Sequence, residues 1–112
     1  MSPHDDTQTC VYSQLGNDPD LAEIVAMFVE EMPQRIAALL QHLEEKDWES
    51  LRRMAHQLKG AAGSYGFELV SPSAGRVESA IRDQQPEQQI RFSVLELVDL
   101  CGRLRSGQPG EP

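Results

Sequence analysis

The chain has 112 residues, which is enough for one hydrophobic core but not for two. Its formal net charge of −8 argues against a general nucleic-acid-binding protein, because phosphate backbones are held by clustered lysine and arginine. No stretch approaches the ~18 consecutive apolar residues of a membrane span, and the first residues lack the basic and apolar regions of a secretory signal. We therefore expect a single cytoplasmic domain that binds neither nucleic acid nor membrane.

Hydrophobic residues make up 39% of the chain but aromatic residues only 5%, so we expect an aliphatic core packed between helices. The two cysteines, Cys10 and Cys101, are far apart in the sequence. Neither belongs to a C-x-x-C or C-x-x-H spacing that would indicate zinc or redox chemistry. We expect both thiols to be reduced, and the protein to hold no metal of its own.

The two ends of the chain are predicted to lie outside the helical domain. Residues 1–17 are mostly polar, and we expect an irregular N-terminal arm whose Tyr12 and Leu15 dock on the domain. Residues 107–112 are rich in glycine and proline, which predicts a flexible tail that suits either a chain end or the stump of a linker. The folded domain is therefore assigned to residues 18–106.

The first helix is predicted to begin at Asp18-Pro19, where the aspartate accepts from free backbone N–H groups and the proline presets φ. Pro33 interrupts the helical pattern and would cost on the order of 3 kcal/mol inside a regular helix. The apolar stripe nevertheless keeps its phase, so we expect two pieces, 19–31 and 33–46, joined by a kink. Its members are Leu21, Ile24, Val25, Phe28, Met32, Ile36, Leu39, Leu40 and Leu43.

The second helix is predicted to follow Asp47 as its N-cap, with Trp48 plugging the end of the domain. It runs to about Tyr65, after which Gly66 supplies the left-handed position that commonly ends a helix. Its apolar face consists of Leu51, Met54, Ala55, Leu58, Ala62 and Tyr65.

The third helix is signalled by Ser71-Pro72, another cap followed by proline, and Pro86 opens the fourth, which ends near Ser106. The apolar set of the third helix is Leu69, Ala74, Val77, Ala80 and Ile81. That of the fourth is Ile90, Val94, Leu97, Val98, Cys101 and Leu104. No strand is evident, and the connections between the long helices are short. Short loops favour antiparallel neighbours, so the pattern predicts an all-α, up-and-down antiparallel four-helix bundle with a kinked first helix.

One histidine in the second helix stands out from this scaffold. At about 100° per residue, His56, Lys59, Gly60 and Gly63 gather on a strip turned away from the apolar face. His56 is therefore expected to face solvent. Each glycine inside a helix costs about 0.8–1.0 kcal/mol relative to alanine. Two of them beside one histidine indicate a surface that a partner approaches closely.

The run Ala55-His56-Gln57-Leu58-Lys59-Gly60-Ala61-Ala62-Gly63 resembles the A-H-x-L-K-G-small-small signature of histidine-containing phosphotransfer (HPt) domains. The resemblance covers about residues 18–105, with an acidic residue before the motif helix and a glycine-ended turn after it. It implies that His56 accepts a phosphoryl group from one receiver-domain aspartate and passes it to another in a His–Asp relay. It also places the start of the third helix a turn earlier, near Phe67.

The resemblance assigns Lys59 the task of holding an ammonium beside the phosphoryl oxygens. Arg52, one turn before His56, and Arg82 on the third helix are weaker candidates for the same electrostatic field. Gln57 points to a different side of the helix and would contact the rim of a partner without touching the phosphate.

Two apolar residues of the first helix are candidate docking contacts. Phe28 and Met32 resemble the apolar side chains that border the histidine in this family and give a receiver domain its footing. They could equally be ordinary core. His4 and His42 lack neighbours like those of His56, and we expect no role for them.

The expected cofactor requirement is simple. An ordinary histidine side chain, with a pKa of about 6.5, is mostly neutral and nucleophilic at pH 7. The partner receiver is expected to bring Mg²⁺, so we expect no cofactor on this chain. No G-x-x-x-x-G-K-[ST] motif occurs, so the protein is not predicted to be an ATP-using enzyme. Expected partners are receiver domains and a hybrid sensor kinase, with the protein itself a monomer.

Two other functions remain open. An HPt-like bundle could bind receiver or kinase domains without transferring phosphate, although the intact motif speaks against that. A helical metal or acid–base enzyme would need a second histidine or carboxylate that converges on His56. The strip around His56 offers none in the sequence.

Overall fold

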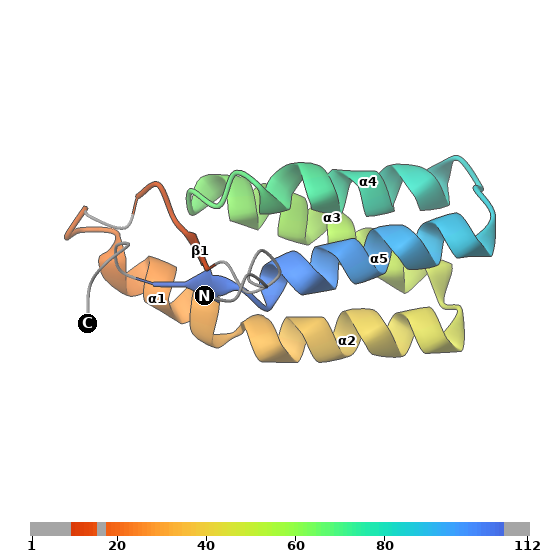
Figure 1. Ribbon diagram of the computed structural model, residues 1–112, viewed down its shortest axis with the longest axis horizontal. Coiled ribbons are helices and arrows are strands. Elements are labelled where there is room, and N and C mark those ends of the chain that lie inside the picture. The colour runs from red at the N-terminus through yellow and green to blue at the C-terminus, as the bar shows by residue number, and fades with distance from the viewer. Residues whose placement is uncertain (1–9, 16–17, 107–112) are drawn as a thin grey trace, which may run out of the picture.

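The computed structural model describes residues 10–15 and 18–106, and expectations for the rest of the arm and for the tail lie outside these residues. The elements in chain order are β1 (Val11–Tyr12), α1 (Ala22–Glu30), α2 (Met32–Glu45), α3 (Trp48–Ser64), α4 (Val70–Arg82), α5 (Glu87–Cys101) and β2 (Leu104–Arg105). The long helices α2 to α5 lie side by side and alternate in direction (Figure 1). The predicted all-α helical bundle is confirmed.

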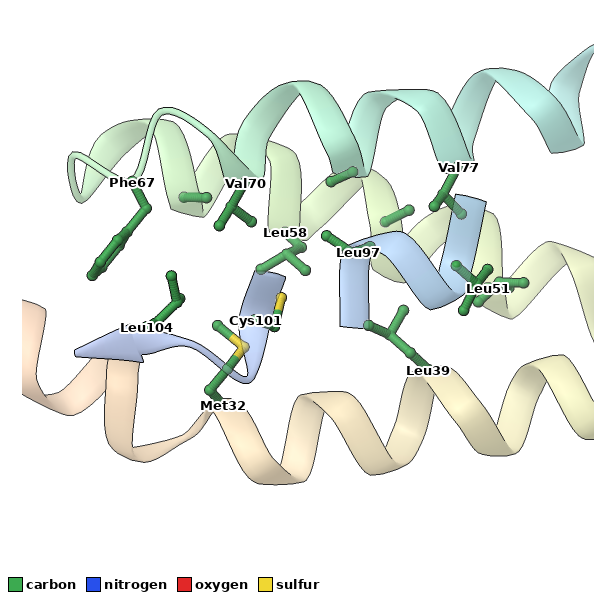
Figure 2. Close-up of a cluster of buried hydrophobic side chains, with 14 of the residues drawn as sticks. Met32, Leu39, Leu51, Leu58, Phe67, Val70, Val77, Leu97, Cys101 and Leu104 are labelled. Carbon is green, nitrogen blue, oxygen red and sulfur yellow. The ribbon is translucent and has the colours of Figure 1, made fainter. Parts of the chain in front are cut away.

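The core consists of aliphatic side chains from every long helix, as the composition predicts. Figure 2 shows labelled side chains of α2, α3, α4 and α5 converging on the bundle interior. Leu39, Leu51 and Leu97 have no exposed surface, and Leu58 is only 1% exposed. Burying one such side chain stabilises the fold by about 1.5–3 kcal/mol. The core therefore holds α3 and α4 in a fixed register.

The predicted kink lies between α1 and α2, which are bent by 39°. Pro33 occupies the first turn of α2, where a missing N–H removes no helical hydrogen bond. The start of α1 is later than predicted, at Ala22. Residues 18–21 form a turn instead, in which the Asp18 carboxylate accepts from the Asp20 N–H at 2.9 Å. Asp18 therefore caps a turn that leads into the helix.

Both predicted ends of α3 are confirmed. The Asp47 carboxylate accepts from the Ser50 N–H at 3.2 Å, and Trp48 packs partly buried against the core. Gly66 has a φ of 83°, which an L side chain adopts at a cost. A Cβ on Gly66 would also lie 2.6 Å from Ser13 Oγ. Residues 13–15 of the arm therefore pack directly on the turn between α3 and α4.

The helix α4 begins at Val70, one residue before the predicted cap. The Ser71 hydroxyl does not cap α4, because it donates to the Lys59 carbonyl of α3 at 2.9 Å. Leu69 was predicted to face the core, but it is 62% exposed and Val70 is buried in its place. Phe67, in the turn, is fully buried.

The chain after α5 corrects the expectation that no strand occurs. Pro86 precedes α5 as predicted, but the helix ends at Cys101 and not near residue 106. Leu104 and Arg105 then pair in parallel with Val11 and Tyr12. The predicted docking of Tyr12 and Leu15 is consistent with their partial burial.

The two cysteines are free, as expected. Cys10 is exposed, whereas Cys101 is buried, and burial raises the pKa of its thiol to about 12. Within residues 10–15 and 18–106, no helix has the length and apolar character needed to span a bilayer.

Candidate functional site

His56 lies in the middle of α3 with its side chain directed outward. The opposite face of the helix is fully buried through Leu51, Ala55, Leu58 and Ala62. The His56 side chain is 62% exposed. The structure therefore confirms the solvent-facing histidine that helical periodicity predicts.

A carboxylate from α4 joins His56 to Lys59. Glu78 Oε2 lies 2.8 Å from His56 Nδ1, and Glu78 Oε1 lies 3.0 Å from Lys59 Nζ. The Glu78 side chain is only 12% exposed, whereas those of His56 and Lys59 stand further into solvent. One largely buried acid thus contacts two exposed basic groups.

The ionisation of Glu78 decides which nitrogen of His56 carries the proton. The pKa of Glu78 is lowered, and the hydrogen bond from Lys59 is the largest cause. Burial of the carboxylate raises this pKa, whereas the hydrogen bond with His56 lowers it further. An ionised carboxylate only accepts hydrogen bonds, so Nδ1 must be the donor. In the neutral ring the lone pair therefore resides on Nε2, the nitrogen that Glu78 does not engage.

Glu78 is the residue that sequence reasoning missed, and it overturns the statement that no carboxylate converges on His56. A signal for it exists in the chain. The helices α3 and α4 are antiparallel across a short turn, so residues equally distant from that turn face each other. His56 and Glu78 are each eleven residues from Phe67.

The same register positions Lys59 against α4. A Cβ on Gly75 would lie 3.3 Å from Lys59 Cδ, so the lysine stem crosses α4 at a residue without a side chain. The Ser71 hydroxyl bonds the Lys59 carbonyl from the same helix. The ammonium therefore reaches Glu78 along the surface of α4.

The glycines of the strip are exposed, as predicted. A Cβ on Gly60 would meet no atom within 4 Å, and one on Gly63 would meet only Ser71 Oγ at 3.7 Å. Packing within the domain therefore does not require a glycine at position 60. The surface beside His56 is open to an approaching partner.

The other predicted polar contacts are not gathered at His56. Arg52 is bound to Glu49 at 2.8 Å, one turn nearer the start of α3. Arg82 donates to Ser79 Oγ at 3.2 Å and stands one turn beyond Glu78 on α4. Gln57 is exposed beside His56. Of these three, Arg82 shares an open groove between α4 and α5 with Lys59 and Glu78.

The proposed apolar footing is corrected by the structure. Phe28 and Met32 are each only 2% exposed, so both belong to the core and present almost no surface to a partner. The Phe28 ring lies 5.0 Å from the Tyr65 ring and 5.6 Å from that of Phe67, which explains its burial. The exposed apolar side chains of α1 are Ile24 and Met27, at 42% and 52%.

One group of potential metal ligands occurs among the described residues at the turn between α2 and α3. Ligand atoms of His42, Glu45 and Asp47 lie within 4.8 Å of one another. His56 is nine residues beyond Asp47 on the chain, or about 13 Å along a helix. Asp47 is already occupied as the cap of α3, so we assign no metal to this group.

The geometry thus defines a helical bundle that presents one oriented histidine on its surface, and the comparison with known families agrees. The family model of the Hpt domain matches residues 23–107, which is most of the chain, and the protein belongs to this family. It is a histidine phosphotransfer module of two-component signalling, a carrier of phosphoryl groups and not a catalytic domain. No curated protein and no solved structure gives a significant match.

Proposed function

We propose that His56 is the residue that carries the phosphoryl group, taking it from one receiver-domain aspartate and giving it to another. The observation that carries this proposal is the 2.8 Å contact between Glu78 and Nδ1 of the exposed His56. It leaves Nε2 as the nucleophilic nitrogen of a ring whose orientation is already set. Phosphoryl transfer depends mainly on such positioning and on electrostatics.

Lys59 is the second member of the proposed site. Its ammonium lies on the same carboxylate as His56, so a phosphoryl group on Nε2 enters the field of a nearby positive charge. A lysine acts as a movable point charge, which suits a group that arrives and leaves. Lys59 therefore stabilises the charge on the phosphoryl oxygens during transfer.

The partner supplies the remaining parts. An aspartyl phosphate is an activated mixed anhydride, so the histidine needs no general base of its own. The Mg²⁺ that neutralises phosphoryl charge belongs to the receiver domain, and this chain contributes no cofactor. A hybrid sensor kinase is the proposed upstream source, and the carrier acts as a cytoplasmic monomer. Gly60, Gly63 and Gln57 lie where the receiver docks.

The proposal is tested by incubating the protein with a phosphorylated receiver domain and Mg²⁺. The chain should acquire a phosphate that is labile in acid and stable in base, as expected for an N–P bond. His56→Gln should abolish the label while the helical circular dichroism is unchanged. His42→Gln is the matched control, because His42 is partly buried in α2, and it should label normally.

Two outcomes contradict the proposal. Full labelling of His56→Gln, or a label that survives acid, would assign the phosphate to another residue. Tight receiver binding without any labelling of the unaltered protein would instead support a module that binds receivers but transfers nothing.

A further inference from the structure

The carboxylate at His56 has a consequence for the second half of the relay, when the phosphoryl group leaves. Resting on the proposed function, we propose that Glu78 keeps the Nδ1 proton on His56 while the ring is phosphorylated, so that the ring departs as neutral imidazole. Glu78 is thereby a positioning residue for onward transfer as well as for acceptance.

When His56 accepts the phosphoryl group, its ring becomes positively charged beside Glu78. The Nε2 lone pair of His56 attacks phosphorus, the N–P bond forms, and the P–O bond to the donor aspartate breaks with its electron pair on the aspartate oxygen. Nδ1 keeps its proton throughout. The phosphorylated ring is therefore an imidazolium cation whose N–H still points at the Glu78 carboxylate.

Onward transfer reverses these steps on a second receiver. Its aspartate oxygen attacks phosphorus, the N–P bond breaks, and the electron pair returns to Nε2. With Nδ1 protonated, the leaving group is neutral imidazole. Without that proton it would be imidazolate, a far stronger base and a correspondingly poorer leaving group. Retention of the Nδ1 proton therefore determines whether the carrier can donate.

Glu78 is placed to retain that proton. Its oxygen accepts from Nδ1 at 2.8 Å, and the charge of the carboxylate already makes this hydrogen bond about twice as strong as a neutral one. A cationic ring adds the Coulomb attraction between opposite charges. The carboxylate is 12% exposed, so water screens the pair less than it would on an open surface. The contact is thus stronger with the cationic phosphorylated ring than with the neutral ring.

The other charged groups near the site do not replace Glu78. Lys59 is a cation on the same carboxylate, so its own field opposes a positive ring. Arg52 and Arg82, each one turn away, are also cations, and they are bound by Glu49 and by Asp83. Among these residues, Glu78 is the group whose charge favours a protonated Nδ1.

Glu78→Gln separates the charge from the geometry, because the amide retains an acceptor oxygen of similar shape. The phosphorylated proteins are isolated and their transfer to a fresh receiver is timed across the neutral and alkaline range. Loss of a nearby opposite charge should move the fall in transfer rate about one pH unit toward neutral. Transfer by Glu78→Gln should then be up to about tenfold slower at alkaline pH and nearly normal at acidic pH. Glu96→Gln, on the exposed surface of α5, should match the unaltered protein.

Each outcome decides the question. Superimposable pH profiles, or an equal loss of rate by Glu78→Gln at every pH, would overturn the role of the charge. If Glu78→Gln fails to fold, NMR of the phosphorylated unaltered protein is decisive. Its Nδ1 proton should persist to higher pH than that of N-acetyl phosphohistidine, and loss at the same pH would refute the proposal. Absence of any label on the unaltered protein would count against the proposed function instead.

Discussion

A single acid serves two basic groups at this site, which makes their properties interdependent. Glu78 holds Nδ1 of His56 with one oxygen and the Lys59 ammonium with the other. Because Lys59 is the largest cause of the lowered pKa of Glu78, it also influences the histidine through the shared carboxylate. A change at any one of the three residues therefore alters the other two.

Lys59→Ala is expected to impair transfer and leave folding almost unchanged. An exposed lysine ion pair contributes at most about 1 kcal/mol to stability. Its loss removes positive charge from the phosphoryl group, so acceptance should slow or the phosphohistidine lifetime shorten. The pKa of Glu78 should rise toward its ordinary value, and NMR titration of the carboxyl carbon measures that rise. Unchanged transfer, lifetime and titration would reduce Lys59 to a surface charge.

At the scale of single residues, the sequence singled out His56 and Lys59 but not the carboxylate that contacts both of them. His56 and Lys59 are visible because helical periodicity shows which side chains share a strip. Glu78 is on another helix, and periodicity carries no information about which residues two helices bring together. The sequence left open whether Phe28 and Met32 are docking contacts or core residues, because an apolar side chain near a site can be buried or exposed.

The helix α3 combines a buried face with an exposed strip of small residues. Glycine weakens a helix, and the open space around Gly60 shows that the domain gains no packing from it. The glycines of this strip are therefore better explained by the approach of a partner than by packing within the domain. The antiparallel α4 completes the site from the other side.

Gly60→Ala should stabilise the isolated protein by up to about 1 kcal/mol, measured by chemical unfolding. Gly60→Gln should also fold, but its side chain would stand one turn from His56 and block receiver binding and transfer. Ala37→Gln, at an exposed position of α2, serves as the control and should bind normally. An unfolded Gly60→Gln would mean that Gly60 serves packing, and normal transfer would mean that the receiver docks elsewhere.

At the scale of elements, the sequence located the helices better than their ends. Pro33 and Pro86 mark real boundaries, whereas Pro19 lies in the turn before α1 and Pro72 lies inside the first turn of α4. Proline fixes φ and lacks an N–H at each of these positions, so it restricts where a helix can begin without fixing its first residue. The prediction that Ser71 caps α4 was wrong, because its hydroxyl donates to a carbonyl of α3 and does not cap the start of its own helix. Tertiary contacts thus decided the termini that local capping signals left open.

In the whole molecule, the turn between α3 and α4 is also where residues 13–15 of the N-terminal arm dock. Ser13 donates to the Tyr65 carbonyl, and the Gln14 N–H donates to the Gly66 carbonyl at 2.9 Å. Gly66 permits this approach for two reasons. Its positive φ forms the turn, and its missing Cβ leaves room for Ser13. The arm therefore reinforces the turn that keeps α3 and α4 in register.

Gly66→Ala should lower the free energy of unfolding by about 1–2 kcal/mol from the left-handed backbone alone, with a further loss as the arm is displaced. Gly102→Ala is the matched control, because its φ is −71° and its nearest contact would be an ordinary 3.5 Å. Chemical denaturation compares the two variants. Equal stability of both would show that the arm and the turn are not tightly joined.

The pairing of β1 with β2 could not be predicted from the sequence, because each strand has only two residues and the two strands lie near opposite ends of the sequence. Val11 pairs with Leu104, so the pairing alone would close a loop at an entropic cost of about 4 kcal/mol. Two short strands cannot offset that cost until the four helices have already brought their ends together. We therefore expect this pairing to form last and to open first. In hydrogen exchange, the Val11 amide, which donates to the Arg103 carbonyl at 2.8 Å, would lose protection well before the amides of α3.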